Sequence, residues 1–193
     1  MVLLAGNKDI KTAVFISGKG SNLKSLIKFS KLKKSPITIE MIISNNYKST
    51  GLVFGKIYKI KKKVFDFDKQ DKAEEKILNI LKKKNINLIC LAGFMKILSR
   101  NFIKKFNGKI LNIHPSLLPK YKGLNTHERA IKNKDIYSGC TVHLVTPKLD
   151  SGKIICQSKV KISKKDTPKT LANKILVQEH KLYPKAIMKI FNL

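Results

Sequence analysis

Short apolar runs alternate with helix-like segments along most of the chain, and this alternation most strongly limits the folds open to it. Such a pattern is typical of βαβ units. The runs predicted as successive strands are 13–17, 37–44, 63–67, 86–92 and 109–113. The helices expected between them are 21–33, 51–58, 72–84 and 99–106. We therefore expect a parallel front half, in which ligands bind at the carboxyl ends of the strands.

The pattern changes after about residue 140. The runs 141–145 and 154–162 resemble the two strands of a hairpin, joined through a segment that contains a proline and a glycine. A closing helix is expected over 168–190, with Pro184 as a candidate break. The sequence thus predicts an α/β fold with a Rossmann-like, doubly wound and mostly parallel sheet and an antiparallel C-terminal part.

Length and hydropathy favour one domain over 1–193, with two small domains as the alternative. Residues 1–12 precede the first predicted strand and are interpreted as a short N-terminal extension. No apolar run approaches the roughly 18–20 residues that span a bilayer. The apolar block at residues 1–6 is too short for a signal peptide. We expect a cytoplasmic protein without membrane contact.

The formal net charge of +29 would ordinarily suggest a nucleic-acid partner. However, only Arg100 and Arg129 among the 41 basic residues are arginine, the side chain favoured for bidentate recognition of bases and phosphates. The lysines are scattered through every segment, and tryptophan is absent. This composition indicates drift toward AT-rich codons, so no specific nucleic-acid partner is expected beyond a weak, salt-sensitive attraction to polyanions.

The cysteines and histidines do not have the spacing of a metal site. The three cysteines are far apart, no Cys-x-x-Cys or His-x-x-x-His pair occurs, and Cys90 and Cys140 have apolar sequence neighbours. No metal is therefore predicted.

The segment 111–127 carries the strongest indication of chemistry. The preceding apolar run delivers Asn112 and His114 two residues apart, so a strand would direct both side chains to one side. Two prolines and a glycine then restrict the chain that follows. A donor amide beside an imidazole suits a reaction in which negative charge grows on a carbonyl oxygen. This pattern favours acyl or formyl transfer.

Three further segments each allow a functional and a structural interpretation. The turn 17–22 leads from a strand through Gly-x-Gly into a helix, which indicates either a site for one phosphate or a simple helix cap. The apolar residues of 95–98 follow a strand and either line a slot for a flat heterocycle or belong to the core. Asp150 is either a turn residue or a carboxylate directed at His114.

Taken together, these segments resemble the glycinamide ribonucleotide formyltransferases over about residues 13–190. The resemblance rests on five separated stretches in the same order: 17–22, 92–99, 111–127, 149–152 and 178–180. It implies transfer of a formyl group from 10-formyltetrahydrofolate, the cosubstrate, to the amine of 5-phosphoribosyl-glycinamide. It also implies a monomer or homodimer, no metal, and a cis bond between Leu118 and Pro119.

The resemblance also assigns roles to residues of this chain. The catalytic residues that it implies are Asn112, His114 and Asp150. The substrate-binding residues are Gly20, Ser21 and Asn22, at the phosphate, and Glu179. The residues implied at the folate are Met95, Lys96, Ile97, Leu98 and Asn112. Two alternatives stay open at this point: a formyltransferase or deformylase with another folate-linked substrate, and a lysine-rich nucleic-acid binder on a degenerate enzyme fold.

Overall fold

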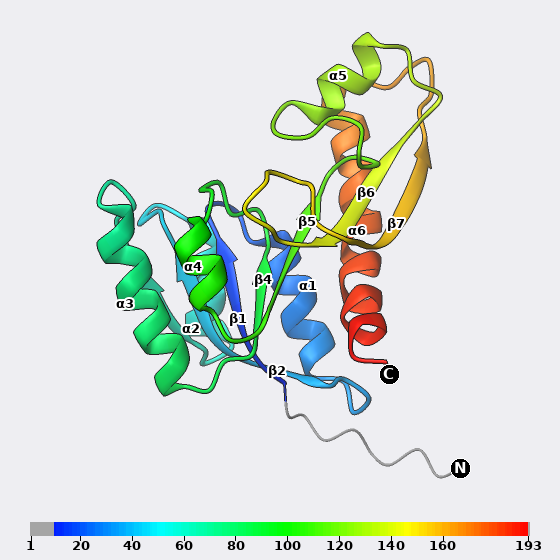
Figure 1. The fold of residues 1–193 in the computed structure, drawn as a ribbon. Coiled ribbons are helices and arrows are strands. Elements are labelled where there is room, and N and C mark those ends of the chain that lie inside the picture. The colour runs from blue at the N-terminus through cyan, green and yellow to red at the C-terminus, as the bar shows by residue number, and fades with distance from the viewer. Residues whose placement is uncertain (1–9, 193) are drawn as a thin grey trace. The chain divides into compact units, whose positions relative to one another are not determined.

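The computed structural model describes residues 10–192, and Figure 1 shows the order of its helices and strands. Contacts within the chain define two compact units, one up to Leu111 and one from Asn112. The elements of the first unit are β1 (Ile10–Ile16), α1 (Ser21–Ser30), β2 (Ile37–Ser44), a 3₁₀ turn η1 (Thr50–Leu52), α2 (Val53–Ile57), β3 (Lys61–Val64), α3 (Gln70–Lys83), β4 (Leu88–Leu91) and α4 (Arg100–Lys105). Strand β5 (Lys109–His114) contains the boundary between the two units. The second unit continues with α5 (Thr126–Lys132), β6 (Tyr137–Leu144), β7 (Ile154–Lys161) and α6 (Pro168–Ile190).

The strands form one seven-stranded sheet in the order β3-β2-β1-β4-β5-β6-β7. Strand β1 pairs in parallel with β2 and β4, and β2 pairs in parallel with β3. Strands β6 and β7 pair antiparallel. The predicted fold class, a doubly wound and mostly parallel sheet with an antiparallel C-terminal part, is confirmed. The single-domain organisation stays a prediction.

The first unit is built around β1, whose residues from Ala13 to Ile16 are fully buried. Helix α1 buries Leu23, Leu26 and Ile27, and α3 buries Ile77 and Leu81. These positions recur every three or four residues, so each helix presents one apolar stripe to the core. Because β1, β2 and β4 are parallel, the loops that follow them leave the sheet at a shared edge.

In the second unit, α6 packs along β6 and β7 (Figure 1). It begins with a capping box between Thr167 and Thr170 and has Pro168 in its first turn. The helix continues through Pro184, so the predicted break is absent. Apolar residues on both sides of that proline, among them Tyr183 and Ala186, are fully buried, and this packing offsets the one backbone hydrogen bond that proline removes.

Several predicted boundaries differ from the structure, and one helix was missed. Strand β1 begins at Ile10 rather than at residue 13, so residues 10–12 of the predicted extension belong to it, and residues 1–9 lie outside the described part. Strand β3 begins two residues early, and β6 begins at Tyr137 rather than 141. Helix α5 was not predicted at all. Its seven residues are too few to show helical periodicity in the sequence. The residue before it, Asn125, has a positive φ of 57°.

Candidate functional site

Asn112 and His114 lie at the end of strand β5. Their side chains point to the same face of the strand, because alternate residues of a strand point the same way. His114 is buried, with 5% of its surface exposed, whereas Asn112 is half-buried. An imidazole so far removed from water depends on its immediate neighbours for its charge.

Both ring nitrogens of His114 face oxygen atoms. Its Nδ1 lies 3.4 Å from Oδ2 of Asp150, and its Nε2 lies 2.8 Å from the backbone carbonyl oxygen of Tyr121. A carbonyl oxygen only accepts, so Nε2 carries a proton and donates to it. The Asp150 carboxylate likewise accepts, so the surroundings of the ring suit a doubly protonated imidazole.

Asp150 lies in the tight loop between β6 and β7, with a positive φ of 43°. Its Oδ2 accepts a hydrogen bond of 2.9 Å from the backbone N–H of Gly123. The same loop requires glycine at position 152, where an added Cβ would lie 1.7 Å from the carbonyl oxygen of Leu144. The two interpretations of Asp150 therefore both hold: it is a turn residue, and its carboxylate faces His114.

His143, on β6, belongs to the same cluster, although no role was predicted for it from the sequence. Its Nδ1 donates to the carbonyl oxygen of Leu144 at 2.8 Å, which leaves Nε2 as an acceptor in the neutral ring. That Nε2 lies 3.2 Å from Nδ2 of Asn112 and 3.6 Å from Oδ1 of Asp150. One signal was available: like His114, it is a histidine near the end of an apolar strand.

Burial and the neighbouring groups shift the pKa values of His114 and Asp150 in opposite directions. Burial lowers the pKa of His114, and the Tyr121 carbonyl and the Asp150 carboxylate oppose that effect only in part. Burial alone would raise the pKa of Asp150, but its contact with His143, the hydrogen bond from the Gly123 N–H and the nearby His114 lower it overall. Asp150 is therefore ionised at neutral pH, next to an imidazole whose charge depends on it.

The segment that follows β5, from Pro115 to Tyr121, is fixed by hydrogen bonds to side chains of the second unit. Its Leu118-Pro119 bond is cis, as the resemblance implied. The Thr141 hydroxyl donates to the Ser116 carbonyl oxygen at 2.6 Å and accepts from the Leu118 N–H. These bonds fix the start of the loop that carries the Tyr121 carbonyl to His114.

Glu179 is buried on α6, with 7% of its surface exposed. Burial, with Glu179 as the next cause, raises the pKa of the Cys140 thiol to about 12, so this cysteine stays a neutral thiol. Cys90 and Cys140 are buried, as their apolar neighbours suggested. Among residues 10–192 no cluster of three or more potential metal ligands occurs.

The predicted phosphate turn lies in the first unit, between β1 and α1. Gly20 precedes the first residue of α1 and has a positive φ of 71°, and an added Cβ there would lie 2.9 Å from Cα of Gly51. The Gly18 carbonyl oxygen accepts from the Gly51 N–H at 3.0 Å and from the Ser49 hydroxyl at 2.7 Å. Two hydrogen bonds and a close backbone approach thus hold the turn, and the first N–H groups of a helix, here beginning at Ser21, favour an anion.

The second loop of the first unit follows β4. Met95 and Ile97 are 66% and 63% exposed, whereas Leu98 is 4% exposed. The core interpretation therefore holds for Leu98 and is wrong for Met95 and Ile97. Two exposed apolar side chains on one loop leave it available to a ligand.

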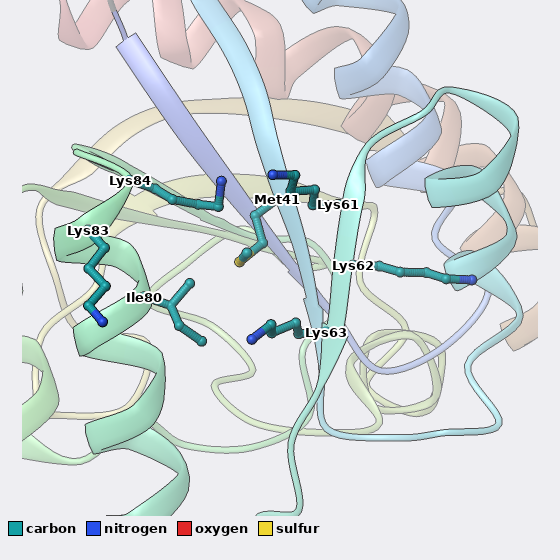
Figure 2. Close-up of a pocket in the computed structure, with 7 residues that line it drawn as sticks. All are labelled: Met41, Lys61, Lys62, Lys63, Ile80, Lys83 and Lys84. Atoms are coloured by element: carbon teal, nitrogen blue, oxygen red, sulfur yellow. The ribbon is translucent and has the colours of Figure 1, made fainter.

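A separate groove of about 430 Å³ also lies in the first unit and contains no predicted site residue. Figure 2 shows Lys61 and Lys63 directed toward it from β3 and Lys62 directed away, as strand alternation requires. Lys62 instead donates to the Leu52 carbonyl oxygen at 3.3 Å. The rest of its lining is Met41, Ile80, Lys83 and Lys84.

No helix within residues 10–192 is both long enough and apolar enough to cross a membrane.

Comparison with known proteins identifies relatives over nearly the whole chain. The model of the formyl transferase family matches residues 10–187. The phosphoribosylglycinamide formyltransferase of Haemophilus influenzae is 42% identical over 180 residues, which cover 92% of this chain and 85% of that protein. The crystal structure of phosphoribosylglycinamide formyltransferase from Brucella melitensis superposes with a TM-score of 0.88 at 40% identity, over 94% of this chain and 95% of that one.

The human trifunctional purine biosynthetic protein adenosine-3 is 40% identical over 186 residues. The match covers 95% of this chain but only 18% of the human protein. The chain thus corresponds to a small part of that larger protein and to most of the bacterial relative.

Proposed function

The chain belongs to the formyl transferase family, and from this premise we propose that it formylates 5-phosphoribosyl-glycinamide in de novo purine biosynthesis. The formyl donor is 10-formyltetrahydrofolate, and the products are formylglycinamide ribonucleotide and tetrahydrofolate. The observation that carries the proposal is the cluster in the second unit of the half-buried Asn112 with the buried His114 and Asp150. Relatives that bear the name of this activity match over most of their length.

The residues of this cluster fit a formyl donor as cosubstrate. Formyl folate supplies an electrophilic carbon whose oxygen becomes negatively charged when an amine attacks. Asn112 has two amide hydrogens, and a bond to Nε2 of His143 uses one of them. The second is available for the substrate oxygen, so His143 orients the Asn112 amide. Such a preorganised donor stabilises the developing charge more than the ground state.

His114 contributes the second donor. Its Nε2 proton is held by the Tyr121 carbonyl at 2.8 Å, whereas the contact of Nδ1 with Asp150 is longer, at 3.4 Å. The longer contact is the weaker one, so the Nδ1 proton is the one that the ring can share with the substrate oxygen while Asp150 stays beside it. Asp150 keeps the ring oriented, favours its cationic form against burial, and organises the water that carries the proton from the amine to the leaving nitrogen.

The remaining predicted residues bind the two substrates in this proposal. Gly20, Ser21 and Asn22 hold the phosphate at the start of α1, and Glu179 contacts the ribonucleotide. The folate lies against the loop of Met95, Lys96, Ile97 and Leu98. Lys96 is exposed and offers a point charge to the folate. The cytoplasmic localisation and the monomeric or homodimeric state stay predictions.

An ultraviolet assay of formyl transfer on the wild type and on His114→Ala tests the proposal. Removal of one donor to an oxyanion typically lowers the rate by about a hundredfold or more. Full activity of His114→Ala would refute the mechanism. Formate release without the ribonucleotide would favour a deformylase, and salt-resistant RNA binding without transfer would favour a nucleic-acid binder.

A further inference from the structure

The loop from Gly93 to Ser99 connects β4 to α4 and is tied down by side chains from other elements of the first unit. Ser17, directly after β1, and Glu74, on α3, make these contacts; Ser17 opens the predicted phosphate turn, but no role was predicted for either side chain. We propose that Ser17 and Glu74 are positioning residues that set the geometry of this loop for formyl folate. The inference rests on the proposed function, which places the folate against Met95 to Leu98.

Ser17 fixes the first half of the loop. Its backbone N–H donates to the Gly93 carbonyl oxygen at 3.1 Å, and its hydroxyl oxygen accepts from the Met95 N–H at 2.7 Å. The hydroxyl hydrogen is donated to Oδ1 of Asn45 at 2.5 Å, and Nδ2 of Asn46 donates to the Ser17 carbonyl oxygen at 3.2 Å. Since its one hydrogen is committed to Asn45, the hydroxyl is held as an acceptor for Met95.

Glu74 fixes the second half. Its carboxylate is buried, with 3% of the residue exposed, and Oε1 accepts from the Ser99 N–H and from Nε2 of Gln70, each at 2.8 Å. Oε2 accepts from the Ser99 hydroxyl. A buried carboxylate is costly unless donors surround it, and these three donors offset that cost.

Two hydrogen-bond partners of Glu74, Gln70 and Ser99, make further bonds that fix the loop. Gln70 also donates through Nε2 to the carbonyl oxygen of Ile97 at 2.8 Å. The Ser99 hydroxyl oxygen accepts from the Phe102 N–H at 3.0 Å and so caps α4, which packs beside α3 (Figure 1). The Glu74 carboxylate therefore holds Ser99 from both its backbone and its side chain.

These bonds decide which backbone groups of the loop face a ligand. The Met95 N–H and the Ile97 carbonyl are engaged by the protein itself. Backbone contacts to the folate are therefore expected from the other groups of this stretch and from the second lone pair of the Ile97 carbonyl oxygen, and the direction of all of them follows from the two fixed groups. A displacement of about 1 Å at such a site can cost about a hundredfold in rate.

The test compares Ser17→Ala and Glu74→Gln with Ser17→Thr, which retains the hydroxyl, and with Glu75→Gln, an exposed neighbour on α3. We expect Ser17→Ala and Glu74→Gln to raise the KM and the Kd for formyl folate by about tenfold, which is about the net free energy of one hydrogen bond. The KM for the ribonucleotide should stay within about threefold of the wild type. Ser17→Thr and Glu75→Gln should resemble the wild type.

Amide hydrogen exchange gives a readout that does not depend on catalysis. Exchange over residues 93–99 should accelerate in Ser17→Ala and Glu74→Gln while the sheet strands stay protected. A lower melting temperature with unchanged folate KM, Kd and loop exchange would show that the two residues only stabilise the unit, and would overturn the inference. A wild type that binds formyl folate but transfers nothing would refute the proposed function alone. A wild type that does not bind formyl folate would refute both.

Discussion

Oδ2 of Asp150 lies 3.4 Å from Nδ1 of His114, and both side chains are only 6% exposed. Burial lowers the pKa of His114, and this carboxylate together with the Tyr121 carbonyl opposes it. The lowered pKa of Asp150 keeps the carboxylate charged at neutral pH. The protonation of His114, on which its role as a donor depends, therefore responds both to the Tyr121 carbonyl and to a carboxylate from the loop between β6 and β7.

We expect Asp150→Asn to lower turnover at neutral pH by about tenfold for each unit of pKa that His114 loses. The KM values should change little, because the Asn carbonyl oxygen can still accept the Gly123 N–H and maintain the turn. Steady-state kinetics with thermal denaturation would check this expectation. Unchanged turnover would show that Asp150 is only a turn residue.

The contact between His143 and Asn112 predicts coupled mutations. His143→Ala should lower turnover by about tenfold because it releases the Asn112 amide, and Asn112→Ala by about a hundredfold because it removes the donor itself. The double variant should be no slower than Asn112→Ala alone, since His143 acts through Asn112. Rate losses that multiply in the double variant would contradict this coupling.

Gly20→Ala tests the phosphate turn. The substitution puts a Cβ on a residue with φ of 71° and within 2.9 Å of Gly51, so the turn must shift. We expect the KM for the ribonucleotide to rise by about tenfold or more, with the KM for formyl folate little changed. Lys19→Ala, at an exposed position of the same turn, is the matched control. Equal effects of both variants would argue against a specific phosphate site.

Stability should fall as the pH drops below 6.5. Burial lowers the pKa of both His114 and His127 from 6.5, so below that pH the unfolded chain binds more protons than the folded one. Well above pH 6.5 both histidines are neutral in the folded and the unfolded chain. As the pH falls from there, the free energy of unfolding decreases progressively until the pH reaches the pKa of each histidine in the folded chain. The loss is at most about 1.4 kcal/mol per pH unit for each group.

His127→Asn should reduce this pH dependence by removing one of the two groups. Nδ1 of His127 is buried and has no hydrogen-bond partner among the described residues, so the substitution breaks no bond at that atom. Urea denaturation between pH 5 and pH 7.5, about the range in which histidine titrates, measures the effect. An unchanged slope in the variant would show that His127 does not titrate differently in the two states.

The order of strands and helices followed from local pattern, because apolar runs and helical stripes are properties of neighbouring residues. The predicted helices and strands were wrong where the apolar pattern was weak or where tertiary packing overrode a local signal. Strand β3 is an edge strand that begins with three lysines, so its apolar signal starts late. Helix α6 continues through Pro184, because buried residues on both sides of it pack against β6 and β7.

The sequence by itself determined that Asn112 and His114 share one side of a strand, because the two-residue period of a strand is a local property. It also indicated a turn at Gly20 and an apolar loop at Met95. It left open whether Asp150 faces His114, because that contact depends on the path of the loop between β6 and β7.

Only the tertiary structure decided which distant groups meet. It placed Asp150 and the Tyr121 carbonyl on the two nitrogens of His114, and His143 beside Asn112. It also joined Glu74 to Ser99. Hydrogen bonds and pKa values depend on distances of a few ångströms between segments remote in the chain, and no local pattern encodes such distances.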